Sequence, residues 1–253
     1  MTAKKTNTLL LAALLGISIL TGGCSIGEAA RKKATYHYQM GLSYLGENNV
    51  TGALVEFTEA EKLEPDNPEL LNYLGLTLYR KNKYVLAEQK YLRALELKPN
   101  NSEVRNNLGV DYLELKRWDE AIAQLKIVTD DIFYSNQEAA SMNLGLAYFG
   151  KGDYPKALAI MRGVVNSDSK NPRGMVNLGR IYLAMEKTDE AIYEFNRALK
   201  LNKEYANAHY YLGLAFMQAK DKKSAAASFR EVLRIAPDSE IGQLSRDYLD
   251  HLK

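Results

Sequence analysis

The sequence predicts an all-α fold, a solenoid of six stacked helix–turn–helix repeats that ends in one capping helix. The first observation is a period. Six glycines that each follow Leu or Met are spaced 34, 34, 36, 34 and 34 residues apart, at Gly41, Gly75, Gly109, Gly145, Gly179 and Gly213. The second is that an alanine follows each glycine by 12 residues, at Ala53, Ala87, Ala121, Ala157, Ala191 and Ala225. A period of this length is typical of proteins in which each repeat packs only against its neighbours.

Each repeat is expected to contain two helices. When every glycine is numbered position 8 of its repeat, packing residues recur at positions 4, 7, 8 and 11 and again at 20, 24 and 27. This spacing places them on one face of each of two helices. Short polar turns such as Lys220-Asp221-Lys222 separate the two halves. One helix pair cannot bury its apolar face alone, so the pairs must stack.

The repeats are predicted to follow one another with a single irregularity. Their bounds are 34–67, 68–101, 102–135, 138–171, 172–205 and 206–239, with a two-residue insertion between the third and the fourth. Proline disfavours helical geometry in the residue before it, so the second helix should end before Pro65, Pro99 and Pro237. Residues 240–253 are expected to form the capping helix, with Asp238 or Ser239 at its start.

This pattern resembles the tetratricopeptide repeat, and all six copies match it. Position 11 carries a large side chain in each copy: Tyr44, Leu78, Tyr112, Tyr148, Tyr182 and Phe216. Position 24 does the same: Phe57, Tyr91, Leu125, Met161, Phe195 and Phe229. The resemblance is specific for the fold, but it names no activity by itself.

Residues 1–23 are expected to be a lipoprotein signal peptide. Lys4 and Lys5 precede an apolar run, Leu9 to Leu20, which is too short for a membrane span. The following Leu20-Thr21-Gly22-Gly23-Cys24 resembles the lipobox of bacterial lipoproteins, in which the cysteine is lipidated and becomes the first mature residue. That family usually has Leu where this sequence has Thr21. The resemblance implies lipid attachment at Cys24; an uncleaved anchor and a soluble secreted product are the alternatives.

Residues 24–33 are expected to form the lipidated start of the mature chain and a short tether. The nine residues after the cysteine span at most about 30 Å, so the repeats would stay near the bilayer. An Asp after the cysteine often retains such lipoproteins in the inner membrane. Ser25 therefore implies the outer membrane, with the protein facing the periplasm. Arg31, Lys32 and Lys33 either begin a solvated helix or contact anionic headgroups.

Composition argues against several functions. Removal of residues 1–23 takes away Lys4 and Lys5 and no acidic residue, so the 33 basic and 31 acidic residues become equal in number. Without a basic excess, nucleic-acid binding is not expected. The one cysteine excludes an internal disulfide, and without a Cys or His cluster no metal site is expected. No catalytic motif is present, so we expect neither an enzyme nor a cofactor or small-molecule substrate.

The first helices should carry a binding surface for another protein on the concave face of the solenoid. Positions 5, 9 and 12 of each repeat are mostly apolar, which is explained either by closer packing between repeats or by a groove for a partner segment. Asn72, Asn106, Arg80 and Arg180 would then orient the partner through its backbone or a carboxylate. The candidate groove residues are Tyr38, Leu42, Asn72, Leu76, Tyr79, Arg80, Asn106, Val110, Leu113, Met142, Leu146, Phe149, Arg180, Tyr210, Leu214 and Met217.

A narrower resemblance points to the type IV pilus biogenesis lipoproteins, also called pilotins. It rests on the lipobox, the short tether, the six repeats and a central stretch: Asn106-Asn107-Leu108-Gly109, Lys116-Arg117-Trp118-Asp119-Glu120-Ala121, Asp130-Asp131-Ile132-Phe133-Tyr134 and Asn143-Leu144-Gly145-Leu146. This resemblance implies a protein that helps a secretin, the outer-membrane channel of the pilus, to reach the membrane and multimerise. The alternative is a general periplasmic adaptor that docks hydrolases or proteases. Ile132-Phe133-Tyr134 either packs under the insertion or belongs to a partner surface.

Overall fold

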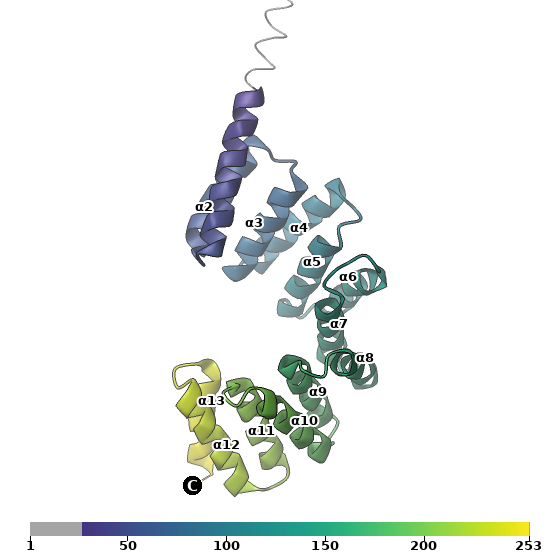
Figure 1. Cartoon of the computed structure of the whole chain (residues 1–253), viewed down its shortest axis with the longest axis vertical. Coiled ribbons are helices and arrows are strands. Elements are labelled where there is room, and N and C mark those ends of the chain that lie inside the picture. The colour runs from purple at the N-terminus through teal and green to yellow at the C-terminus, as the bar shows by residue number, and fades with distance from the viewer. Residues whose placement is uncertain (1–26, 253) are drawn as a thin grey trace, which may run out of the picture. The chain divides into compact units, whose positions relative to one another are not determined.

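The computed structural model describes residues 27–252, which form helices joined by short turns (Figure 1). Within these residues there is no strand, and the predicted all-α repeat fold is confirmed. The predicted signal peptide and Cys24 lie outside the described residues. The helices are residues 27–46, α2 (Val50–Leu63), α3 (Pro68–Arg80), α4 (Tyr84–Leu97), α5 (Ser102–Glu114), α6 (Trp118–Asp130), α7 (Gln137–Lys151), α8 (Tyr154–Ser167), α9 (Pro172–Ala184), α10 (Thr188–Leu201), α11 (Ala206–Gln218), α12 (Lys222–Ile235) and α13 (Glu240–His251).

The chain forms two compact units. The first contains the helix at 27–46, then α2, α3, α4 and α5 as far as Asp111. The second runs from Tyr112 through α6 to α13. In both units the helices follow the predicted alternation, so that α3 packs against α4, α7 against α8, α9 against α10 and α11 against α12.

The first helix begins earlier than the sequence predicts. Residues 27–33, predicted to belong to the tether, are already helical and continue into the helix of the first repeat. A helix rises about 1.5 Å per residue, so these residues span roughly 10 Å and cannot provide the extended reach expected of them. Ala34 is buried, which gives this helix its first inward-facing contact.

The glycine at position 8 allows each helix pair to pack closely. A methyl group added to Gly41, Gly75, Gly179 or Gly213 would lie between 2.5 and 2.6 Å from an aromatic ring on the second helix. These rings belong to the position 24 residues Phe57, Tyr91, Phe195 and Phe229, and all four are buried. The large side chain therefore fills the space that the missing Cβ leaves.

The alanines at position 20 complete this packing. All six are fully buried: Ala53, Ala87, Ala121, Ala157, Ala191 and Ala225. Alanine has no side-chain rotamers to lose and favours helix formation, so it suits a helix face that lies directly against another helix. The two periodic residue types of the sequence thus mark the contact between paired helices.

The turn between the two helices of each repeat has the same backbone geometry. Position 15 is left-handed in all six repeats, at Asn48, Asn82, Lys116, Gly152, Glu186 and Lys220. The next backbone N–H donates to the carbonyl of position 11, for example from Lys187 to Tyr182 at 2.9 Å. This arrangement satisfies carbonyl groups at the end of the first helix. Only one of these positions is glycine, and the five other residues carry the cost of a left-handed conformation.

The helix ends agree with the predicted signals. Helices α2, α4 and α12 end two residues before Pro65, Pro99 and Pro237. Ser239, not Asp238, caps α13, because its Oγ accepts a hydrogen bond from the backbone N–H of Gly242 at 3.1 Å. The Tyr248 ring of α13 stacks on the Phe229 ring with centroids 4.9 Å apart. Helix α13 therefore covers the end of the sixth repeat, as the sequence predicts.

Replacing Gly179 by Ala tests the glycine–ring contact. The new methyl group would lie 2.5 Å from the buried Phe195 ring, so we expect a loss of about 1–3 kcal/mol in the free energy of unfolding. Gly145→Ala is the matched control, because its nearest neighbour is the flexible end of Met161 at 3.0 Å. The gain in helix propensity, about 1 kcal/mol, should offset most of that contact. Urea unfolding measures both variants, and an equal loss of unfolding free energy in the two would contradict this account.

Replacing Glu186 by Gly tests the strained turn. Glu186 is exposed and has a φ of 61°, so glycine should raise the free energy of unfolding by up to about 1 kcal/mol. The reciprocal control is Gly152→Ala, where φ is 85° and no atom crowds the new methyl group. This control should lose about 1 kcal/mol through backbone strain alone. Thermal unfolding measures both, and a less stable Glu186→Gly variant would refute the assignment.

Candidate partner-binding site

The predicted groove residues of position 5 mostly pack between repeats. Asn72, Met142 and Tyr210 are buried, and so is Val176 at the same position of the fifth repeat. Burial raises the pKa of the Tyr210 phenol, with the nearby Tyr248 and Tyr211 adding to it. For these residues, closer packing between repeats is the correct explanation of the apolar stripe. They lie beneath the accessible surface and do not present a side chain to a partner.

Asn72 forms side-chain hydrogen bonds inside the first unit. Its Nδ2 donates to Glu103 Oε1 at 3.1 Å, and its Oδ1 accepts from Asn107 Nδ2 at 2.9 Å. These bonds join α3 to α5, so Asn72 links two repeats and does not orient a partner as the sequence analysis suggests. Tyr38 lies nearby, 5.8 Å from the Tyr73 ring. Burial, together with Tyr73, Glu69 and Glu103, raises the pKa of Tyr38 to about 12.

Positions 9 and 12 form the accessible part of the predicted surface. Their side chains are half-buried: each contributes to the packing and keeps part of its surface in solvent. In the first unit these candidates are Leu42, Leu76, Tyr79 and Val110, and in the second Leu113, Leu146, Phe149, Arg180, Leu214 and Met217. Of the remaining candidates, Asn106 is half-buried and Arg80 is exposed at the end of α3.

The second unit has a hollow on this face with a volume of about 220 Å³. Three successive first helices, α7, α9 and α11, contribute to it, together with the turn before α11. Its lining residues are Leu146, Arg173, Val176, Asn177, Arg180, Tyr205, Asn207 and Tyr211. The repeat stack therefore brings two predicted groove residues, Leu146 and Arg180, into one site.

Arg180 lines this site, and its side chain contacts two aromatic rings and Asn177. Its guanidinium carbon lies 5.3 Å from the centroid of the Phe149 ring and 4.9 Å from that of the Tyr211 ring. Its Nη1 also donates to Asn177 Oδ1 at 3.0 Å. Cation–π contacts of this kind hold the flat guanidinium over the rings. A guanidinium has five N–H donors, so Arg180 retains donors for a ligand.

The chemistry of the hollow favours an anionic group on an apolar segment. Arg173 adds a second cation, and none of the eight lining residues is acidic. Leu146 supplies apolar surface beside the charges, and Asn207 can donate or accept. A carboxylate would form charge-assisted, bidentate hydrogen bonds with an arginine fixed in this way. A peptide with an acidic side chain next to an apolar one fits this arrangement.

Six of the eight lining residues are not among the predicted groove residues: Arg173, Val176, Asn177, Tyr205, Asn207 and Tyr211. Arg173 and Asn207 occupy position 2, which lies on the same helix face but has no apolar signature. Tyr211 is at position 6, and Tyr205 comes from the turn before α11. A search for charged residues at position 2 could have found Arg173. The contribution of a turn residue depends on how two repeats stack, which one sequence does not reveal.

The insertion between α6 and α7 presents two large apolar side chains. Ile132 is 84% exposed and Phe133 is 88% exposed. Asp131 fixes the turn, because its Oδ1 accepts from the Phe133 N–H at 3.0 Å and its carbonyl accepts from the Tyr134 N–H at 3.1 Å. The side chain of Gln137 also donates to this carbonyl. Packing beneath the insertion is therefore ruled out for Ile132 and Phe133, and an accessible apolar surface remains.

Residues 27–252 contain no group of three or more His, Cys, Asp or Glu side chains with metal-binding geometry. None of the described helices is long and apolar enough to span a bilayer. His37, one of the three histidines, pairs with Glu56 at 2.7 Å and joins the first helix to α2.

Comparison with known proteins agrees with this description. The model of the tetratricopeptide repeat family matches residues 38–102, 106–172 and 176–240. The human Superkiller complex protein 3 is 30% identical over 223 residues, which are 83% of this chain and 14% of that protein. This chain therefore spans only a small part of that relative.

Two solved structures share the fold. A structure of PilW, described as a widely conserved type IV pilus biogenesis factor, has a TM-score of 0.75 at 19% identity and covers 83% of this chain and 97% of that one. A structure of pilF from Pseudomonas aeruginosa has a TM-score of 0.68 at 20% identity and covers 87% and 99%. At these identities the likeness concerns the fold.

Replacing both Ile132 and Phe133 by Ser tests whether the insertion is free of the core. The side chains are exposed, so the free energy of unfolding should change by less than about 0.5 kcal/mol. The control is Phe229→Ala, which removes a buried ring and should cost about 3–5 kcal/mol. Urea unfolding followed by circular dichroism measures both. A loss above about 2 kcal/mol in the double variant would mean that these residues are buried in solution.

Proposed function

Because the chain belongs to the tetratricopeptide repeat family and is thus a scaffold for protein–protein interactions, we propose that it is a lipid-anchored assembly factor of type IV pili. In this role it binds a segment of the secretin and helps the secretin subunits to reach the outer membrane and multimerise. The pilotin-like sequence features and the shared fold with PilW support this proposal. Scaffolds of this fold are typically not enzymes, and the proposed role requires no catalysis.

The hollow around Arg180 is the observation on which the proposal mainly rests. It combines a fixed cation, two aromatic rings and an apolar wall on the face that the first helices share. Arg and aromatic side chains are the residues that contribute most often to protein-binding hot spots. A secretin segment with a carboxylate beside an apolar side chain would fit, and Leu214 and Met217 on α11 would extend the contact.

The membrane anchor would make this binding effective. A lipid on Cys24, with more than one acyl chain, would hold the protein stably at the periplasmic face of the outer membrane. Tethering raises the local concentration of the bound segment, so weak binding at each scaffold suffices to gather several secretin subunits. The exposed pair Ile132 and Phe133 provides a second apolar contact, because large apolar side chains in solvent favour association.

Arg180→Ala in the full-length protein tests the proposal in the cell. Loss of its charge-assisted hydrogen bonds should weaken secretin binding roughly tenfold to a hundredfold and lower the amount of secretin multimers. Arg180→Lys should bind the secretin almost as weakly as Arg180→Ala does, since lysine keeps the charge but neither stacks flat on the rings nor forms bidentate hydrogen bonds. The measurements are secretin multimers on gels, surface pili and capture of the secretin from detergent extracts.

The control is Lys126→Ala, which removes one exposed positive charge from α6 and should leave all three readouts unchanged. A strain that lacks the gene shows how much of the secretin multimerises without this protein. Unchanged secretin multimers after deletion would overturn the pilus role. Capture of a cell-wall hydrolase or protease in place of the secretin would instead identify a general periplasmic adaptor.

A further inference from the structure

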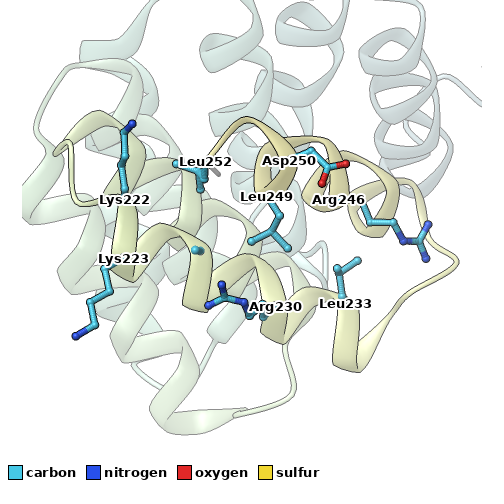
Figure 2. Close-up of a pocket in the computed structure, with 9 residues that line it drawn as sticks. Lys222, Lys223, Arg230, Leu233, Arg246, Leu249, Asp250 and Leu252 are labelled. Atoms are coloured by element: carbon cyan, nitrogen blue, oxygen red, sulfur yellow. The ribbon is translucent and has the colours of Figure 1, made fainter.

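A second candidate site lies at the end of the sixth repeat and shares no lining residue with the Arg180 hollow. Helices α12 and α13 enclose a groove of about 610 Å³ (Figure 2). Figure 2 shows Leu233 and Leu249 near its middle, Lys222 and Lys223 at one end, and Arg246 at the other. The groove thus has apolar side chains in its centre and cations around them.

Within the described part of the chain, the basic side chains of this groove have no ion-pair partner. Among residues 27–252, no carboxylate forms an ion pair with Lys222, Lys223 or Arg230, and Arg246 donates to the carbonyl of Pro237 at 2.7 Å. Arg234 on the same helix behaves differently, because it pairs with Glu231 at 2.9 Å and with Glu204 at 3.3 Å. Four cations therefore face the groove with Asp250 as the one acidic lining residue.

The apolar centre exists because the repeat pattern stops here in the described chain. In the fifth repeat, Ile192 and Leu199 are partly buried and pack against the core that continues into the next repeat. The residues one period later are Ala226 and Leu233, and only α13 follows them. Leu249 of α13 packs partly against the core around Phe229 and keeps a side open to the groove.

We propose that this groove binds an acidic amphipathic segment of a partner protein. Apolar side chains of the segment would contact Leu233 and Leu249, and its carboxylates would pair with Lys222, Lys223, Arg230 and Arg246. The chain as a whole carries a formal charge of only +2, so this concentration of unpaired cations is local. A bilayer is a poorer match, because the two leucines are half-buried between helices and do not protrude.

Fluorescence anisotropy with the purified full chain tests this proposal directly. The probe is a fluorescein-labelled helical peptide with leucines along one face and glutamates on both sides of that face. Two control peptides replace either every glutamate by lysine or every leucine by serine. We expect saturable binding of the first peptide that weakens as salt is raised, and at least tenfold weaker binding of both controls.

Three variants locate the binding. Arg230→Glu reverses an exposed charge in the groove, and Ala226→Gln fills the groove without changing its charge; each should weaken binding at least about tenfold. Lys126→Glu makes the same change in net charge on α6 and should leave binding intact. Circular dichroism confirms that all three variants are folded.

Several outcomes would overturn the proposal. Equal weakening by Arg230→Glu and Lys126→Glu would mean that the peptide responds to net charge alone. If the serine peptide bound as tightly as the leucine peptide, apolar contacts with Leu233 and Leu249 would not contribute to the affinity. Binding to phosphatidylglycerol vesicles without peptide binding would mean that the groove binds a lipid surface instead of a protein segment. Because the readout depends on α12 and α13, it is independent of the secretin assay, and either proposal can fail while the other stands.

Discussion

Close contact between a glycine on one helix and a large side chain on the next is the constraint on which this structure depends. In four repeats the ring at position 24 occupies the space above the glycine so tightly that a methyl group would collide with it. The buried alanines at position 20 keep the same two helices close along their length. This contact fixes each pair, and pairs of fixed geometry can stack with little variation. The regular fold is therefore a consequence of one small residue repeated at one position.

The regular stack also determines where function can arise. Position 5 mostly joins neighbouring repeats, and four of its six side chains are buried, whereas positions 9 and 12 remain half-exposed. The features with distinctive chemistry lie where the pattern is interrupted. Arg180 replaces the apolar residue found at position 9 in the other repeats, Ile132 and Phe133 occupy the insertion, and the α12–α13 groove marks the last repeat. The candidate binding sites thus coincide with departures from the period.

Unpaired charge, like the distinctive side chains, is concentrated at a few places on the surface. The chain is close to neutral, and many of its exposed charges are paired, such as Lys151 with Asp119 or Arg93 with Asp66. Exposed pairs of this kind contribute little to stability. The cations in the Arg180 hollow and in the α12–α13 groove differ because they lie beside apolar side chains and face almost no acid. A nearly neutral protein can therefore present cationic sites at defined places without being positively charged over its whole surface.

The sequence by itself determined the all-α fold, the six repeats, the proline-terminated helices and the capping helix. Each of these follows from contacts within one repeat or between neighbours, which a fixed period records. Only the tertiary structure revealed that position 15 is left-handed, since Lys116 and Glu186 give no turn signal, and that Asn72 links α3 to α5. It also decided that Arg180 lies between Phe149 and Tyr211, residues from two other helices. Contacts among three helices depend on the stacking angle of the repeats, and no single repeat encodes that angle.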